Sequence, residues 1–180
     1  IAHKGPRLPR NPVIIEKPSG KGVGGPNEQT VNNPLAIADL DGMIALGDDG
    51  NISVVHAASL LIMKQRLSAH RGGIYAATFD TTGSYLVTGG LDCQVNWWAW
   101  QNLVQFATAR SPNHGILSLL SAGFFDHGDD TVIAGNVNGN LALLDPIRDT
   151  PRKMIHAHDG PVFALKAVPG FSVFASAGND

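Results

Sequence analysis

Three side chains of the types that make a catalytic triad lie within one stretch of this 180-residue sequence. His70, Thr88 and Asp92 could supply a general base, a hydroxyl nucleophile and an orienting carboxylate. A triad also needs an exposed nucleophile and an oxyanion site. The alternative is structural, because the same groups can link neighbouring strands and satisfy one another where they are buried.

The same residue types return at the end of the chain, as His158, Ser176 and Asp180. A set that recurs along one chain indicates a repeated structural element rather than a single active site. We therefore predict that the sequence holds no catalytic residues and that the protein is not an enzyme.

Three further patterns could bind a ligand. His156 and His158 lie on one face of a strand, but no Cys or carboxylate completes a familiar zinc spacing. The acidic run Asp126–Asp130 lacks the spaced oxygen ligands of a calcium loop. The glycines of Gly20–Gly25 match G-x-G-x-x-G, but Pro26 follows where a phosphate loop needs a helix. We predict no metal and no cofactor.

Four segments share a short polar turn that follows small residues, and in the first three an alternating apolar run comes next. The turn residues are Asp49, Asp92, Asn138 and Asp180, at spacings of 43, 46 and 42 residues. Four-stranded propeller blades repeat with a period of about 40–45 residues. The spacing therefore predicts blades of a β-propeller.

A histidine precedes three of these turns at a nearly constant distance. His70, His114 and His158 lie 22, 24 and 22 residues before the turn residue. The residues between are typical of strands joined by tight turns, because short apolar runs alternate with Asp, Gly and Pro. The predicted strands are Ile74–Phe79, Tyr85–Thr88, Val95–Trp100, Val162–Val168 and Val173–Ser176. Ala57–Arg66 has helical character, but we interpret it as a strand because a blade's outer strand belongs there.

This pattern resembles the WD40 repeat. In the second repeat, His70, Thr88, Asp92 and Trp98 occupy the Gly-His, Ser/Thr, turn-Asp and Trp positions of that family. The resemblance extends over nearly the whole chain after residue 35, and it implies that these side chains form a hydrogen-bonded structural tetrad. The sequence departs from the pattern at Ala99, where the family's terminal dipeptide has Asp. The first and third repeats also lack the Trp, so some blades lack the complete tetrad.

Three segments are similar, in this order, to blades of the echinoderm microtubule-associated-protein-like (EMAP-like) family. They are Val87–Trp100, Thr131–Asn140 and Ala157–Leu165. This resemblance implies two joined propellers and binding to tubulin or microtubules. The family's hydrophobic entry motif and coiled-coil segment do not occur in this sequence.

The predicted fold class is all-β, with about three and a half to four WD40 β-propeller blades present and the propeller therefore incomplete. We expect residues 1–34 to contain a blade start with a Pro/Gly-rich basic insertion, and residues 35–180 to form the WD40 propeller segment. Because a propeller must close, we expect the missing blades to come from further sequence or from a partner.

Charge is distributed unevenly along the chain. Residues 1–30 carry a net charge of +3 and the remaining 150 carry −5. An extended basic surface is therefore absent, and we expect no direct contact with nucleic acid. The basic N-terminal arm and one tryptophan at a strand end are the candidate partner contacts. These residues are Lys4, Arg7, Arg10 and Trp100.

These observations predict a non-enzymatic scaffold that docks other proteins. Under the EMAP-like resemblance the partner is tubulin or a microtubule, and the location is the cytoplasm and cytoskeleton, including the cilium or flagellum axoneme. The alternative is a generic WD40 adaptor in a nuclear or cytoplasmic ribonucleoprotein or ubiquitin-ligase assembly. Cys93 is the only cysteine, so an internal disulfide is excluded. No apolar stretch of the sequence is long enough to span a membrane.

Overall fold

Fourteen strands, and no helix among the described residues, make up the fold. A computed structural model describes residues 36–40, 43–47, 49–112, 114–122, 131–168 and 171–180, which belong to one compact unit. None of these residues forms a helix that could cross a membrane.

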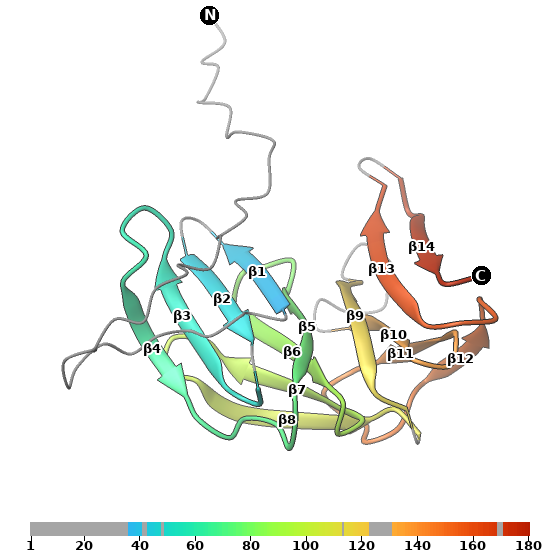
Figure 1. The fold of residues 1–180 in the computed structure, drawn as a ribbon, viewed down its shortest axis with the longest axis horizontal. Helices are drawn as coiled ribbons and strands as arrows, with labels where there is room; N and C mark the ends of the chain where they lie inside the picture. The colour runs from blue at the N-terminus through green and yellow to red at the C-terminus, as the bar shows by residue number, and fades with distance from the viewer. Residues whose placement is uncertain (1–35, 41–42, 48, 113, 123–130, 169–170) are drawn as a thin grey trace, which may run out of the picture. The chain divides into compact units, whose positions relative to one another are not determined.

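The strands form three four-stranded sheets and one hairpin (Figure 1). The first sheet contains β1 (Ala36–Leu40), β2 (Met43–Gly47), β3 (Ile52–His56) and β4 (Ile62–Arg66). The second contains β5 (Ile74–Phe79), β6 (Tyr85–Gly90), β7 (Gln94–Ala99) and β8 (Val104–Arg110). The third contains β9 (Ile116–Ser121), β10 (Val132–Asn136), β11 (Asn140–Leu144) and β12 (Lys153–His156). The hairpin consists of β13 (Val162–Ala167) and β14 (Phe174–Gly178).

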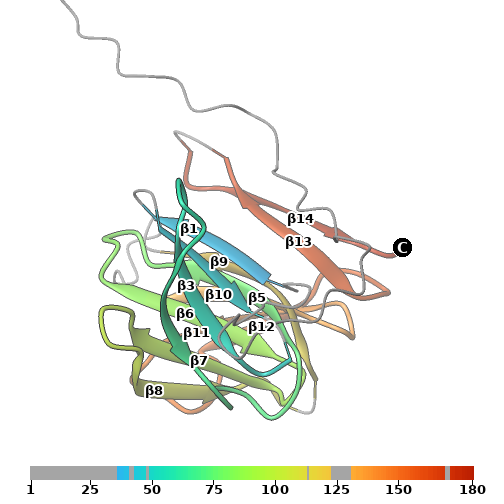
Figure 2. The same cartoon turned by 60° about the vertical axis from the view of Figure 1, so that its left-hand side comes forward.

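Within each sheet, each strand pairs with the next one along the chain, and every pairing is antiparallel. The first strand of each sheet lies beside the first strand of the next, so that β1, β5, β9 and β13 are successive neighbours. Figure 2 shows these strands from a second direction. The architecture confirms the predicted incomplete WD40 β-propeller, with three complete blades and two strands of a fourth.

Alternate positions of one strand enter two different hydrophobic clusters, as strand geometry requires. In β7, Trp98 packs in a cluster with Ile52 and Val54 of the first blade. Its neighbour Trp97 packs in a second cluster with Ile116 and Val132 of the third blade. Both indole rings are almost completely buried. The second blade is therefore held on both faces by aromatic side chains from a single strand.

Most of the strand predictions match the structure within two residues at each end. The strand predicted over Ala57–Arg66 is confirmed for its second half, β4, whereas residues 57–61 form a turn and the residues that follow it. The predicted N-terminal segment, residues 1–34, lies outside the described residues, and its boundary with the propeller segment stays a prediction.

Candidate functional site

The imidazole of His70 links the loop before β5 to the turn between β6 and β7. Its Nδ1 lies 2.9 Å from Oδ1 and 3.1 Å from Oδ2 of Asp92. The backbone N–H groups of Arg71 and Gln94 donate to the same carboxylate. Burial alone would raise the pKa of Asp92, but the hydrogen bonds from His70 and the two N–H groups outweigh it and lower that pKa. Asp92 is thus a carboxylate held in place by three donors.

Nε2, the other imidazole nitrogen of His70, contacts a hydroxyl on β6 that is also bound by a side chain of β7. Nε2 of His70 lies 2.7 Å from Oγ1 of Thr88, and the indole N–H of Trp98 donates to the same oxygen over 2.9 Å. Because Nδ1–H donates to Asp92, Nε2 accepts the Thr88 proton. The structure therefore places all four predicted tetrad residues of the second repeat in one continuous row.

Asp92, His70 and Thr88 are linked in the order carboxylate, imidazole, hydroxyl, as in a catalytic triad. Unlike the nucleophile of a triad, however, the hydroxyl of Thr88 is buried. Thr88 is only 1% exposed, and the indole of Trp98 occupies the second hydrogen-bonding position of Oγ1. A nucleophile needs a free approach to its oxygen. This geometry supports the structural interpretation of His70, Thr88 and Asp92.

Two further residues extend this row, and sequence analysis missed them. Asn96 donates to the carbonyl oxygen of Ala69, and its amide nitrogen also lies 3.2 Å from Nε2 of His70. Gln105 of β8 donates to Oδ1 of Asn96. The available signal was a single Asn in an otherwise apolar run of β7, because a buried amide needs partners. With Asn96 and Gln105, the network reaches the outermost strand.

The fourth repeat brings its predicted residues together in the same way. Nδ1 of His158 lies 2.9 Å from Oδ1 of Asp180, and Nε2 lies 2.9 Å from Oγ of Ser176. The backbone N–H of Asp159 donates to Asp180, as Arg71 does to Asp92. Only the tryptophan position is absent from the described residues, because this hairpin has two strands.

The third repeat uses a different arrangement. The amide nitrogen of Asn138 lies 3.0 Å from both ring nitrogens of His114, whose side chain is partly exposed. The turn is closed instead by Asn136, whose Oδ1 accepts the backbone N–H groups of Asn138 and Asn140. In the first repeat, Asp49 is exposed and has no described histidine partner.

The remaining predicted contacts and ligands are placed as follows. Trp100 is half-buried; its indole N–H donates to the carbonyl of Gly83, and its ring meets Phe79 edge-on. His156 contacts Asn140 and Asp159 rather than sharing a ligand with His158. No group of three or more His, Cys, Asp or Glu in the described part of the chain could hold a metal ion. The acidic run and the basic arm, including Lys4, Arg7 and Arg10, lie outside the described residues.

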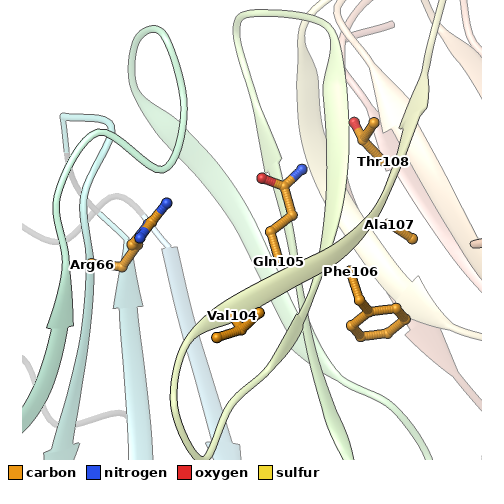
Figure 3. Close-up of a pocket in the computed structure, with 6 residues that line it drawn as sticks. All are labelled: Arg66, Val104, Gln105, Phe106, Ala107 and Thr108. Carbon is orange, nitrogen blue, oxygen red and sulfur yellow. The ribbon is translucent and has the colours of Figure 1, made fainter.

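A groove separates the outer strands of the first two blades (Figure 3). It has a volume of about 490 Å³ and is lined by Arg66 of β4 and by residues 104–108 of β8. Val104 and Phe106 lie on one side of β8 and Gln105 on the other, with Arg66 across from them (Figure 3). Val104 is 54% and Phe106 48% exposed, so an apolar wall faces solvent.

Irregular strand pairing accompanies an exposed apolar side chain on each of the two outer strands, β4 and β8. The register of β8 on β7 shifts so that Phe106 is an extra residue, and the register of β4 on β3 shifts at Met63. A bulge of this kind turns a side chain away from the face that the regular alternation of the strand would give it. Both outer strands therefore present a large apolar side chain outward, and Met63 is 53% exposed.

Comparison with known proteins identifies a WD40 repeat in this chain. The family described as "WD domain, G-beta repeat" matches residues 62–99, the segment with the complete hydrogen-bonded row. The chain is 26% identical to "Autophagy-related protein 16" of Arabidopsis thaliana over 131 residues, 73% of this chain and 25% of that protein. It is 29% identical to "WD repeat-containing protein 46" of Homo sapiens over 106 residues, 58% of this chain and 17% of that protein.

The chain thus spans about a quarter or less of the lengths of these relatives. A solved structure with the same fold is the crystal structure of the computationally designed Ika4 protein. It has a TM-score of 0.65, 17% sequence identity, and coverage of 86% of this chain and 89% of that one. At this identity the likeness shows the fold alone. The sequence matches are to WD-repeat proteins in general and do not support the EMAP-like family in particular.

Proposed function

We propose that this protein is a docking module that binds an extended segment of a partner protein along the groove between β4 and β8. The observation that carries the proposal is the exposed pair Val104 and Phe106 on an outermost strand. An outermost strand offers unpaired backbone groups, and peptides commonly add to such an edge as a further strand. Alternate apolar side chains of the bound segment would then pack on Val104 and Phe106.

The charges beside the groove favour an acidic partner segment. β4 and β8 carry Lys64, Arg66 and Arg110 and no carboxylate, although residues 31–180 as a whole are acidic. Arg66 forms no ion pair with any described residue. A segment that alternates apolar and acidic residues complements this surface in both respects. We therefore assign the groove to acidic–apolar peptide segments.

The test is selection of peptides from a random library displayed on phage, using the full 180-residue chain as the target. The expected result is enrichment of peptides with alternating apolar and acidic residues. Val104→Ser combined with Phe106→Ser should weaken their binding at least about tenfold, because burial of each apolar side chain contributes roughly 1–2 kcal/mol. Ile147→Ser is the matched control, since Ile147 is apolar and highly exposed but lies outside the groove. Enrichment that survives the groove variant would contradict the proposal.

The microtubule hypothesis is a narrower version of the same function, and the EMAP-like resemblance and the basic arm support it. The acidic blades do not favour attraction to the acidic microtubule surface, so the contact would fall to Lys4, Arg7 and Arg10. Its test is co-sedimentation with microtubules at several salt concentrations. Salt-sensitive binding that is lost when these three residues are changed to Glu supports it, together with a cytoskeletal location. Absence of co-sedimentation favours the generic adaptor, and binding that survives these changes contradicts the assignment of the contact to the basic arm.

A further inference from the structure

In the turn between the second and third strands of each blade, one residue has a positive φ, and its type differs between the blades. In the first and third blades this position is Gly50 and Gly139, with φ of 81° and 80°. The next repeat packs directly onto each glycine: His70 N donates to the carbonyl of Gly50 and His158 N to that of Gly139, both over 3.1 Å. A β-carbon at Gly50 would lie 2.6 Å from the carbonyl oxygen of His70, and one at Gly139 only 1.7 Å from that of His158.

In the second blade the same position is Cys93, with φ of 65°. The carbonyl of Cys93 accepts the N–H of Ser111 over 2.9 Å, as the carbonyl of Gly139 accepts the N–H of Ala157 over 2.9 Å. The next residue is Pro112, which has no N–H and so cannot make the second hydrogen bond that His158 makes to Gly139. The loop leaves a crevice of about 380 Å³, whose lining includes Arg71, Gln94, Arg110 and Pro112.

The crevice is lined by two guanidinium groups and one carboxylate, so it carries a net positive charge. Arg71 and Arg110 are exposed, and neither forms an ion pair within the described part of the chain. The carboxylate of Asp92 also lines the crevice, but it accepts hydrogen bonds from His70 and from two backbone N–H groups. Burial raises the pKa of the Cys93 thiol, and so does the charge of Asp92, which keeps the thiol neutral.

A buried hydroxyl in the same crevice lacks a partner. Ser111 is 1% exposed, and its Oγ has no hydrogen-bond partner among the described residues. A buried hydroxyl without a partner is unfavourable, so a ligand oxygen that accepts its hydrogen bond would be stabilised here. Two guanidinium groups and one hydroxyl donor form a set suited to a phosphate monoester.

We propose that this crevice binds a phosphorylated serine or threonine of a partner protein, between Arg71 and Arg110 and beside Ser111. The inference rests on the proposed protein-docking function and adds a second, chemically distinct contact. A glutamate offers one charge for two guanidinium groups and is therefore the weaker ligand. Nucleic acid needs a continuous basic track, whereas residues 31–180 hold eight basic and thirteen acidic residues.

The test is fluorescence anisotropy of the full chain with three peptide libraries that share degenerate flanks and have phosphoserine, serine or glutamate at the centre. The expected result is at least about tenfold tighter binding of the phosphoserine library. Arg71→Ala and Arg110→Ala should each remove most of that preference, whereas Arg148→Ala, another exposed arginine outside the crevice, should leave it unchanged. Circular dichroism verifies that each variant keeps the fold.

Equal binding of the three libraries would overturn the proposal, as would a phosphoserine preference that both arginine variants retain. Equally tight, arginine-dependent binding of a single-stranded oligonucleotide would also overturn it, because the site would then recognise polyanions. Groove variants at Val104 and Phe106 separate the two functions. In these variants peptide selection should be lost and the phosphate preference kept. Peptide selection that survives in them contradicts the groove alone, and an unaltered chain that selects acidic–apolar peptides without any phosphate preference contradicts the crevice alone.

Discussion

Gly90 lies directly against the imidazole of His70. A β-carbon at residue 90 would lie 2.7 Å from Nδ1 of His70 and 2.9 Å from Oδ1 of Asp92. Gly178 has the same relationship to His158 in the fourth repeat, with a β-carbon distance of 2.7 Å to Nδ1. The third repeat has Asn136 at this position and no histidine–aspartate pair. A glycine two residues before the turn Asp is thus a condition for that pair.

Gly90→Ala should therefore destabilise the protein by roughly 2 kcal/mol, because the methyl group displaces the His70–Asp92 pair and leaves buried polar groups unsatisfied. Urea unfolding of the full chain measures the change. Gln101→Ala, at an exposed position of the next turn in the same blade, is the control and should change stability by less than about 0.5 kcal/mol. If Gly90→Ala left the free energy of unfolding unchanged, the close contact between residue 90 and His70 would be easily relieved.

Thr88→Val should cost about 1–3 kcal/mol, since the isosteric methyl group leaves the indole N–H of Trp98 without a partner and Nε2 of His70 with only the 3.2 Å contact to Asn96. Thr88→Ser keeps the hydroxyl and should lose less. Thermal unfolding of both variants provides the comparison. If Val were tolerated as well as Ser, the hydroxyl would not hold the row together.

The stability of the protein should fall in acid partly through Asp92. Its pKa is lower in the folded protein than the ordinary value of 3.8. The carboxylate therefore stabilises the fold above the unfolded pKa, and this contribution disappears as the pH falls through the lower, folded pKa. Urea unfolding between pH 5 and pH 2.5 should show a shallower loss of stability for Asp92→Asn than for the unaltered chain. If stability fell equally steeply with pH in both proteins, the carboxylate of Asp92 would not contribute to the acid sensitivity.

The packing of the second blade on the third depends on Gly89. A β-carbon there would lie 2.4 Å from Cγ2 of Ile116 on the neighbouring blade. Gly89→Ala should cost roughly 1–3 kcal/mol through overpacking. Because Ile116→Ala removes the opposing methyl group, the double variant should lose less than the sum of the single losses. If the losses of stability were additive, Gly89→Ala would destabilise β6 itself and not the packing between the blades.

Much of this architecture follows from local patterns. The constant turn spacing predicted the blades, and the recurrence of His and Asp indicated which turns contact which loops. The opposite faces of Trp97 and Trp98 follow from strand alternation alone. These features need only neighbouring residues and a fixed period, so a single sequence contains them.

The candidate docking surfaces could not be predicted in the same way. The groove needs β4 and β8, which are separate outer strands, and the outward turn of Phe106 arises from a bulge that no residue pattern marks. The crevice depends on the backbone conformation of Cys93 and on how closely the next loop approaches it. Asn96 and Gln105 were missed because their role depends on partners in other strands.

Docking on β8 can be measured by hydrogen exchange of the full chain, with and without a peptide selected on it. We expect slower exchange concentrated in residues 104–108, with a smaller effect at the end of β4 near Arg66. The Val104→Ser, Phe106→Ser variant should show neither change. Protection confined to other parts of the chain, with residues 104–108 exchanging as in the free protein, would contradict docking at this groove.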